Sequence, residues 1–280
     1  MNRFCGIPFS RLQGYLIKVL FISVTGGVLL SACQNEEVPP EVSLYEECRT
    51  HFRATSYKVA AKTCEQAADL GVTGAQWLLA QIYDHGLNDE EPDPAKAFSW
   101  YLAAAKGGMV DAQTVVGESY ISAIGVNTDY EQAFFWLSRA AKEDDANAEF
   151  ALGNIFFEGT GKEKDISLAL SWYKKAAAKK HVMSMNNLAW IYATSQHKAF
   201  RDLKKAQYWV RELEQVMDGE PAFLDTKAAV LALAGEFELA IELQNQAIAN
   251  LPEDIDESTL IAFQQHLDAY NNQKAWVEEK

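Results

Sequence analysis

The sequence predicts an all-α protein built as a solenoid of stacked helix pairs. Three residue types recur at a regular spacing of 36 or 37 residues, which indicates a single repeated unit. They are Trp100, Trp136, Trp172 and Trp209; Asp93, Asp129, Asp165 and Asp202; and Ala97, Ala133, Ala169 and Ala206. Self-similarity at a period of about 20 to 50 residues is typical of solenoids, whose units bury their apolar faces only against neighbours. Such folds provide long binding surfaces, so the pattern favours a binding protein.

Residues 1–32 are predicted to be a secretory signal that does not take part in the fold. Arg3, Arg11 and Lys18 make the start basic, and the apolar run over 19–30 is too short to span a membrane comfortably. The segment ends in Leu30-Ser31-Ala32-Cys33, which resembles the bacterial lipobox. That resemblance implies cleavage before Cys33 and lipid on the new terminal cysteine. An ordinary signal peptide and an uncleaved anchor helix are the alternatives.

The residues after Cys33 indicate a cellular location and a tether. In lipoproteins an aspartate after the lipidated cysteine typically gives retention in the inner membrane, and here that residue is Gln34. The resemblance therefore implies the periplasmic face of the bacterial outer membrane, with the lipid as the membrane contact. Residues 33–42 are acidic and contain Pro39-Pro40, so they are predicted to be a tether.

The charge balance excludes some partners. Removal of residues 1–32 takes away three positive charges and no negative ones, which moves the formal net charge from −14 to −17. Nucleic acid and anionic lipid headgroups would be repelled by such a surface. The hydrophobic content of 49% is too high for general disorder, and the remaining chain is long enough for one extended repeat domain.

Two cysteines, Cys48 and Cys64, remain in the predicted mature chain beside the acylated Cys33. They lie eight residues on either side of Ser56. Residues 43–53 and 56–70 look helical with a turn between them, so both cysteines are expected at the same height of an antiparallel hairpin. In an oxidising compartment we therefore expect a disulfide; two buried thiols are the alternative.

Each repeated unit is expected to contain two helices joined by a polar or glycine-bearing loop. The first helix carries a small residue with an aromatic three positions later, as in Ala80 and Tyr83 or Gly153 and Phe156. The small residue admits a neighbouring helix, and the aromatic fills the space beside it. The loop ends at the repeating aspartate, which precedes the second helix and is therefore predicted to be its N-cap.

The whole pattern resembles the Sel-one-like repeat, the longer relative of the tetratricopeptide repeat. It reads LG-x-x-Y, a glycine loop, D-x-x-x-A-x-x-W-Y and an alanine pair, across three units from about Gly74 to Lys180. The resemblance implies a right-handed α-solenoid of stacked antiparallel helix pairs. We expect Sel-one-like repeats over 43–180, including the N-terminal hairpin, and tetratricopeptide-like repeats over 181–251. Residues 252–280 are expected to form a capping helix and a tail that frays beyond Asn271.

In solenoids of this kind the first helices line a concave groove, so the resemblance also implies a binding surface. The positions that flank the packed small residue and aromatic are Trp77, Gln81, Asp84, Thr114, Glu118, Ile121, Phe150, Asn154, Phe157, Asn186 and Trp190. Large aromatics with amides and few basic groups suit an extended peptide or another protein's helix or tail, and not an acidic ligand. The alternative is that Trp77, Phe150 and Trp190 belong to the core between repeats.

Motifs for catalysis, metals or cofactors are not found in the sequence. Residues 117–121 (GESYI) begin like a nucleophile elbow but lack the closing glycine and fall in a helix position. The five histidines form no HExxH motif, and the acidic loop over 84–93 fails the calcium-loop spacing of an EF-hand. We therefore expect no catalytic residues, no metal site and no cofactor.

The leading functional hypothesis is a non-enzymatic adaptor, lipid-anchored in the bacterial envelope, that binds a protein or peptide partner in its groove. A structural lipoprotein of a secretion or pilus assembly is the second hypothesis. A cell-wall-related hydrolase is the third, and it lacks a nucleophile paired with a base. The sequence specifies neither the partner nor the oligomeric state.

Overall fold

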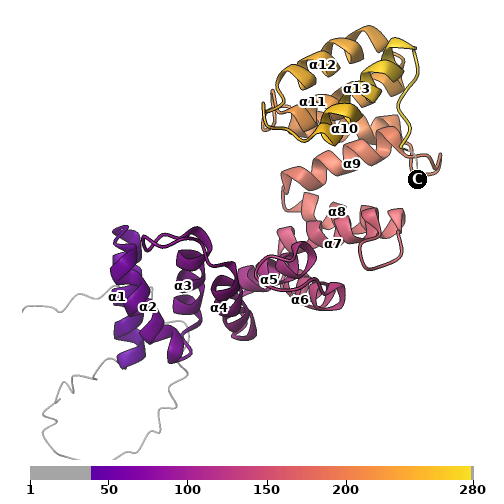
Figure 1. The fold of residues 1–280 in the computed structure, drawn as a ribbon. Coiled ribbons are helices and arrows are strands. Elements are labelled where there is room, and N and C mark those ends of the chain that lie inside the picture. Colours follow the sequence, from indigo (N-terminus) through magenta and orange to yellow (C-terminus); the bar gives the residue numbers. More distant parts are fainter. Residues whose placement is uncertain (1–38, 279–280) are drawn as a thin grey trace, which may run out of the picture. The chain divides into compact units, whose positions relative to one another are not determined.

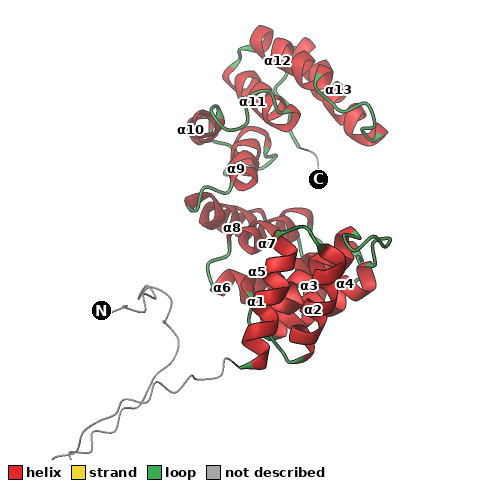
Figure 2. Ribbon diagram, turned by 90° about the vertical axis from the view of Figure 1, so that its left-hand side faces the viewer, coloured by secondary structure: helices red, strands yellow, loops and turns green. Residues whose placement is uncertain are grey.

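The structure is a computed structural model that describes residues 39–278, which form thirteen α-helices and no β-strand (Figures 1 and 2). The predicted all-α solenoid class is therefore confirmed. The predicted signal peptide, Cys33 and the tether as far as residue 38 lie outside the described residues. The helices are α1 (Pro40–Arg53), α2 (Tyr57–Asp69), α3 (Thr73–His85), α4 (Pro94–Lys106), α5 (Val110–Ser122), α6 (Tyr130–Lys142), α7 (Ala146–Glu158), α8 (Ile166–Ala178), α9 (Val182–Thr194), α10 (Leu203–Leu213), α11 (Pro221–Ala234), α12 (Phe237–Ala249) and α13 (Glu257–Asn271).

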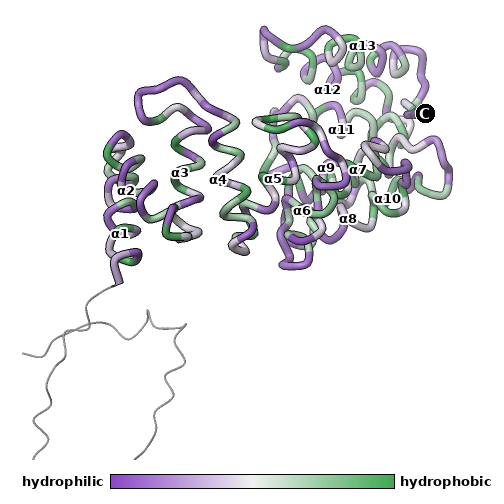
Figure 3. The backbone as a smooth tube through the Cα atoms, turned by 60° about the horizontal axis from the view of Figure 1, so that its bottom comes forward, coloured by the Kyte–Doolittle hydropathy of each residue, from purple (hydrophilic) through white to green (hydrophobic). Residues whose placement is uncertain are grey.

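Consecutive helices pack in pairs, from α1 with α2 to α11 with α12, and each pair also contacts the next (Figure 1). The connecting loops are polar; the loop from α3 to α4, for example, is hydrophilic along most of its length (Figure 3). Most contacts are thus made between neighbours in sequence, as expected for a solenoid. Within residues 39–278 no helix has the length and apolar character needed to cross a membrane.

The repeating aspartates start the second helix of four successive units. Their side chains accept the backbone N–H of the residue three positions later at 2.9–3.1 Å, in Asp93, Asp129, Asp165 and Asp202. The backbone N–H of each aspartate donates to the carbonyl of an aromatic residue near the end of the preceding helix, for example from Asp165 to Phe156 at 2.8 Å. One residue therefore closes the loop and begins the helix, which confirms the N-cap prediction.

Small residues set the distance between the two helices of a unit. A Cβ atom added at Gly153 would lie 2.4 Å from the ring of Tyr173, and one at Gly117 would lie 2.6 Å from Leu137 Cγ. Both partners come from the second helix of the same unit and are fully buried. The glycines are therefore required by the close approach of side chains from the paired helix.

The N-terminal hairpin contains the predicted disulfide. Cys48 on α1 and Cys64 on α2 are bonded, with their Cα atoms 4.8 Å apart, and both are fully buried. The hairpin also covers one end of the core, because Tyr45 and Phe52 pack with Leu79 of α3. Helix α1 begins at Pro40, three residues earlier than the start expected at residue 43, because proline is well tolerated at the first position of a helix.

Between residues 272 and 278 the C-terminal tail packs against the repeats, whereas the sequence predicted fraying beyond Asn271. After α13 the chain returns to α9, where the backbone N–H of Glu278 donates to the carbonyl of Thr194 at 2.9 Å. The Trp276 ring lies 4.5 Å from the His266 ring and packs against the largest buried cluster. Burial of this aromatic side chain provides the apolar anchor that holds the tail.

Candidate functional site

A groove lies across the first helices of three successive units, α3, α5 and α7. It consists of two adjoining hollows, of about 400 and 440 Å³, that share Val115, Glu118 and Phe150. We call them the Tyr101 hollow and the His181 hollow after one residue that lines each, and together the central groove. Both volumes fall within the range of about 300–1000 Å³ that is common for ligand sites.

Seven of the eleven residues predicted to form a binding surface line the central groove. The Tyr101 hollow contains Asp84, Glu118, Ile121, Phe150 and Asn154. The His181 hollow contains Trp77, Thr114, Glu118 and Phe150. The structure therefore brings together side chains from three helices, α3, α5 and α7, that follow one another at the repeat spacing in the sequence.

The other four predicted residues do not line the central groove. Gln81 is half-buried on α3 and lines neither hollow. Phe157 lines a separate hollow of about 490 Å³ that it shares with Thr194 and Glu278. Asn186 is 6% exposed, and the half-buried Trp190 packs 5.2 Å from His266. The central groove, as these two hollows define it, therefore does not include the predicted α9 positions Asn186 and Trp190.

Helix α9 packs closely against α11, and this packing accompanies the burial of Asn186 and the partial burial of Trp190. Helices α9 and α11 contact each other extensively, whereas α5 and α7 make few contacts. Small residues allow this approach: Ala193, Ala228 and Ala229 are all buried in one cluster. Helix α13 and the tail add a further layer, with His266 between Trp190 and Trp276.

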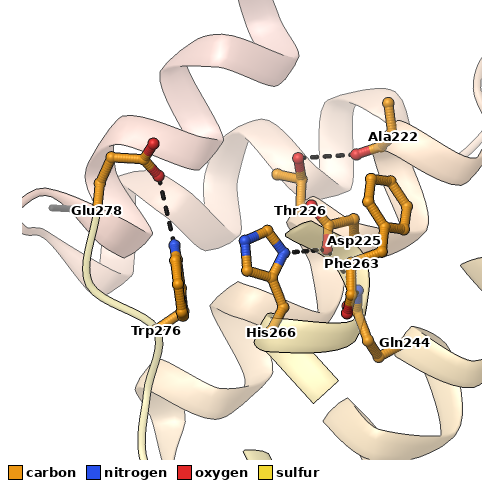
Figure 4. A network of polar contacts seen from close by, with 8 residues as sticks. All are labelled: Ala222, Asp225, Thr226, Gln244, Phe263, His266, Trp276 and Glu278. Carbon is orange, nitrogen blue, oxygen red and sulfur yellow. Dashed lines mark hydrogen bonds and ion pairs between the residues drawn. The ribbon is translucent and has the colours of Figure 1, made fainter. Parts of the chain in front are cut away.

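A buried polar network fixes α13 in this position (Figure 4). His266 Nδ1 lies 2.7 Å from Asp225 Oδ1 on α11. Gln244 Nε2 on α12 donates to the same oxygen at 2.7 Å and to the Phe263 carbonyl at 3.1 Å. One buried carboxylate thus joins α11, α12 and α13, as buried polar groups require partners.

The aromatic floor of the central groove is shared between the surface and the core. Trp77 and Phe150 are each half-buried. The Trp77 ring lies 5.1 Å from the Tyr101 ring, and the Phe150 ring lies 4.7 Å from His181. Each ring therefore packs against another aromatic on one side and lines a hollow on another, so both interpretations of these aromatics hold in part.

Two tyrosine hydroxyls hold polar side chains at the groove. Tyr101 donates to Asp84 Oδ2 at 3.2 Å, and Tyr173 donates to Asn154 Oδ1 at 2.7 Å. Burial raises the pKa of both tyrosines, and the nearby Asp84 carboxylate raises the pKa of Tyr101 further. Both hydroxyls therefore stay protonated and remain donors at neutral pH.

The lining of the central groove is acidic. Its carboxylates are Asp84, Asp111, Glu118, Asp145 and Glu158, and its lining includes no lysine or arginine. Burial lowers the pKa of His181, although the Asp145 carboxylate opposes that shift, so this histidine contributes little positive charge at neutral pH. Desolvation, followed by the charge of Asp145, raises the pKa of Glu118.

Two residues of this lining were missed because they belong to helix termini. The Asp145 side chain accepts the Ala148 N–H and the Thr114 hydroxyl, and His181 accepts the Ser184 N–H, so they cap α7 and α9. Their positions repeat at the same 36-residue period as the aspartates of the second helices. That period is the signal from which both could have been found.

A family model for the Sel1 repeat matches residues 73–109, 110–145, 146–181 and 182–212. Together these segments span half of the 280-residue chain. The chain belongs to the Sel1 repeat family. Each matched segment coincides with one helix pair, from α3–α4 to α9–α10. The Sel1 repeats thus extend to residue 212, beyond the expected change to tetratricopeptide-like repeats at residue 181.

Solved structures with the same fold include other Sel1 repeat proteins. One is a protective antigen present in uropathogenic Escherichia coli strains and displaying an SLR fold, with 24% identity and a TM-score of 0.65. The alignment covers 80% of this chain and 46% of that one, so this chain spans less than half of that relative. A Sel1 repeat protein from Oxalobacter formigenes aligns at 24% identity, with a TM-score of 0.61 and coverage of 74% and 85%. No curated protein matches the chain.

Sel1 repeat proteins are generally protein-interaction scaffolds, and typically non-enzymatic ones. In this chain Ser119 lines the Tyr101 hollow, but its hydroxyl donates to the Val115 carbonyl of its own helix at 2.8 Å. The buried pair of His266 and Asp225 contacts Gln244 and aromatic rings. Among residues 39–278 no group of three or more His, Cys, Asp or Glu side chains is arranged to hold a metal ion.

Proposed function

We propose that this Sel1 repeat protein is a non-enzymatic adaptor that holds a segment of a partner polypeptide in the central groove. The observation that carries the proposal is the groove itself, which combines an apolar floor with fixed polar groups. Trp77 and Phe150 provide the floor, and Asp84 and Asn154 are held by tyrosine hydroxyls. Peptide-recognition sites commonly combine apolar pockets with a few oriented polar groups in this way.

We also propose that the protein is anchored by lipid at Cys33 on the periplasmic face of the bacterial outer membrane. The lipobox-like sequence before Cys33 and Gln34 after it support this location. The disulfide between Cys48 and Cys64 is consistent with an oxidising compartment. Radiolabelled palmitate should be incorporated by the wild type and not by Cys33→Ser. Equal labelling of both proteins would contradict lipidation at this residue.

In-cell photo-cross-linking tests the adaptor proposal. A photoreactive phenylalanine analogue is placed at Asn147, which is exposed and lines the His181 hollow. The matched control carries the same analogue at Lys174, an exposed residue on α8 that does not line the groove. We expect one or a few defined adducts from position 147 and none of the same size from position 174. Identical adducts from both positions, or none from position 147, would reject the groove as the binding site.

A further inference from the structure

We infer that the segment held in the central groove is cationic: a stretch of polypeptide that carries lysine or arginine beside a large apolar residue. This inference rests on the proposed function and specifies the chemistry of the partner at the same site. Two independent properties of the groove carry it, namely the excess of carboxylates and the aromatic floor between them.

Charge complementarity is the first property. Five carboxylates line the groove without a lysine or arginine among the lining residues. Within residues 39–278 the carboxylates of Glu118 and Asp111 make neither a hydrogen bond nor an ion pair, unlike that of Asp145. Complementary charge across an interface steers association and rejects partners of like charge. A cationic partner fits this lining, and an acidic one is repelled.

Three of the carboxylates lie where the fold gains little from their charge. Asp84 and Glu158 belong to the last turns of α3 and α7, where the helix dipole disfavours anions. Glu118 lies at the junction of the two hollows, where desolvation and the Asp145 charge raise its pKa. By contrast, Asp145 caps α7 and has a structural role. Hydroxyls donate to Asp84 and Glu158, but within residues 39–278 none of the first three carboxylates pairs with a lysine or arginine, so their charges are available to a ligand.

Binding of a ligand would remove water from Glu118 and so raise the free energy of its ionised carboxylate. A neutral or acidic segment would leave that cost uncompensated, whereas a lysine or arginine side chain would offset it with a charge-assisted hydrogen bond. The Glu118 carboxylate thus favours a segment that places a lysine or arginine beside it and disfavours a neutral or acidic segment.

The aromatic floor distinguishes a polypeptide from a small cation. Trp77 and Phe150 are half-buried, and both line the His181 hollow of about 440 Å³, which has walls from α3, α5 and α7. A large apolar side chain fills such a space, and the faces of these rings attract the stem and head of lysine or arginine. A metal ion has no apolar group, and a free polyamine has only thin methylene chains, which do not fill this space as a large apolar side chain does.

Selection from a displayed library of random 12-residue peptides tests the inference. The target is the chain from Gln34 to Lys280, and binders are counter-selected on the double variant Asp111→Lys/Glu118→Lys after its melting temperature has been checked. We expect the groove-dependent peptides to be enriched in lysine and arginine and to contain a large apolar residue. Their affinity should fall as salt rises from 50 to 500 mM, because salt screens exposed charges.

Variants that remove single charges complete the test. Glu118→Gln and Glu158→Gln should each weaken a selected peptide about two- to fivefold, as for exposed ion pairs, without lowering the melting temperature. Glu253→Gln, an exposed carboxylate in the loop after α12, is the matched control and should leave affinity unchanged. Groove-dependent peptides that are neutral or acidic, or spermidine binding as tight as the peptides, would overturn the inference alone. No groove-dependent peptide at all would also reject the proposed function.

Discussion

Loss of the Cys48–Cys64 disulfide should destabilise the N-terminal hairpin locally. The bond joins residues separated by 16 positions, and closing a loop of that size restricts the unfolded chain by about 3 kcal/mol. In a solenoid each unit depends mainly on its neighbours, so the loss should be concentrated in α1 and α2. Reduction of the chain from Gln34 to Lys280 is the cleanest perturbation, because Cys48 and Cys64 are its only cysteines.

Hydrogen exchange followed by mass spectrometry measures this effect along the chain. A loss of about 3 kcal/mol corresponds to roughly a hundredfold faster exchange for amides that open with the hairpin. We expect this acceleration in residues 40–69 and little change in α5 to α8. The double variant Cys48→Ala/Cys64→Ala should behave like the reduced protein and should not respond to reductant. Equal acceleration along the whole solenoid, or none in residues 40–69, would refute this reasoning.

Three further predictions follow from particular contacts. Gly153→Ala places a methyl group against the Tyr173 ring, so urea unfolding should show a free energy of unfolding lower by about 1–2 kcal/mol, net of the gain in helix propensity. A variant more stable than the wild type would contradict the close approach of Tyr173 to Gly153. Trp276→Ala should accelerate hydrogen exchange of the Glu278 amide about fivefold, because the contact between the Trp276 and His266 rings is worth about 1 kcal/mol. An unchanged exchange rate would mean that the Trp276 ring does not anchor the tail. The folded-state pKa of Glu118 is raised, so the stability that its protonated form contributes is present at low pH and is lost as the pH rises through that pKa. The melting temperature of Glu118→Gln should therefore exceed that of the wild type at pH 7 and equal it below about pH 4. A lower melting temperature of the variant at pH 7 would contradict a raised pKa.

The periodic features of this protein are predictable from its sequence. The second-helix caps at Asp93, Asp129, Asp165 and Asp202 and the disulfide of the first hairpin were all expected, and the structure contains them. A repeat reports the same local interaction several times, so capping and packing residues stand out against a variable background. For Trp77 and Phe150 the sequence left groove and core open, and in the structure both line the His181 hollow while packing against another ring.

The features that the sequence did not predict depend on single long-range contacts. Trp276 belongs to no repeat, so nothing in the pattern indicates that it packs on His266 and returns the tail to α9. The burial of Asn186 and the partial burial of Trp190 accompany the close approach of α9 and α11, which involves the alanines of two different units. The acidity of the groove required the three-dimensional arrangement, because Glu118 and Glu158 come from different helices.

Carboxyl footprinting of the protein with its captured partner tests the central claim most directly. Carbodiimide-driven labelling is compared for the free protein and for the complex with the protein identified by cross-linking at position 147. We expect labelling of Asp111, Glu118 and Glu158 to fall in the complex, while Glu253 outside the groove is labelled as before. Protection at Glu253 without protection at the three groove carboxylates would contradict a partner held across α3, α5 and α7.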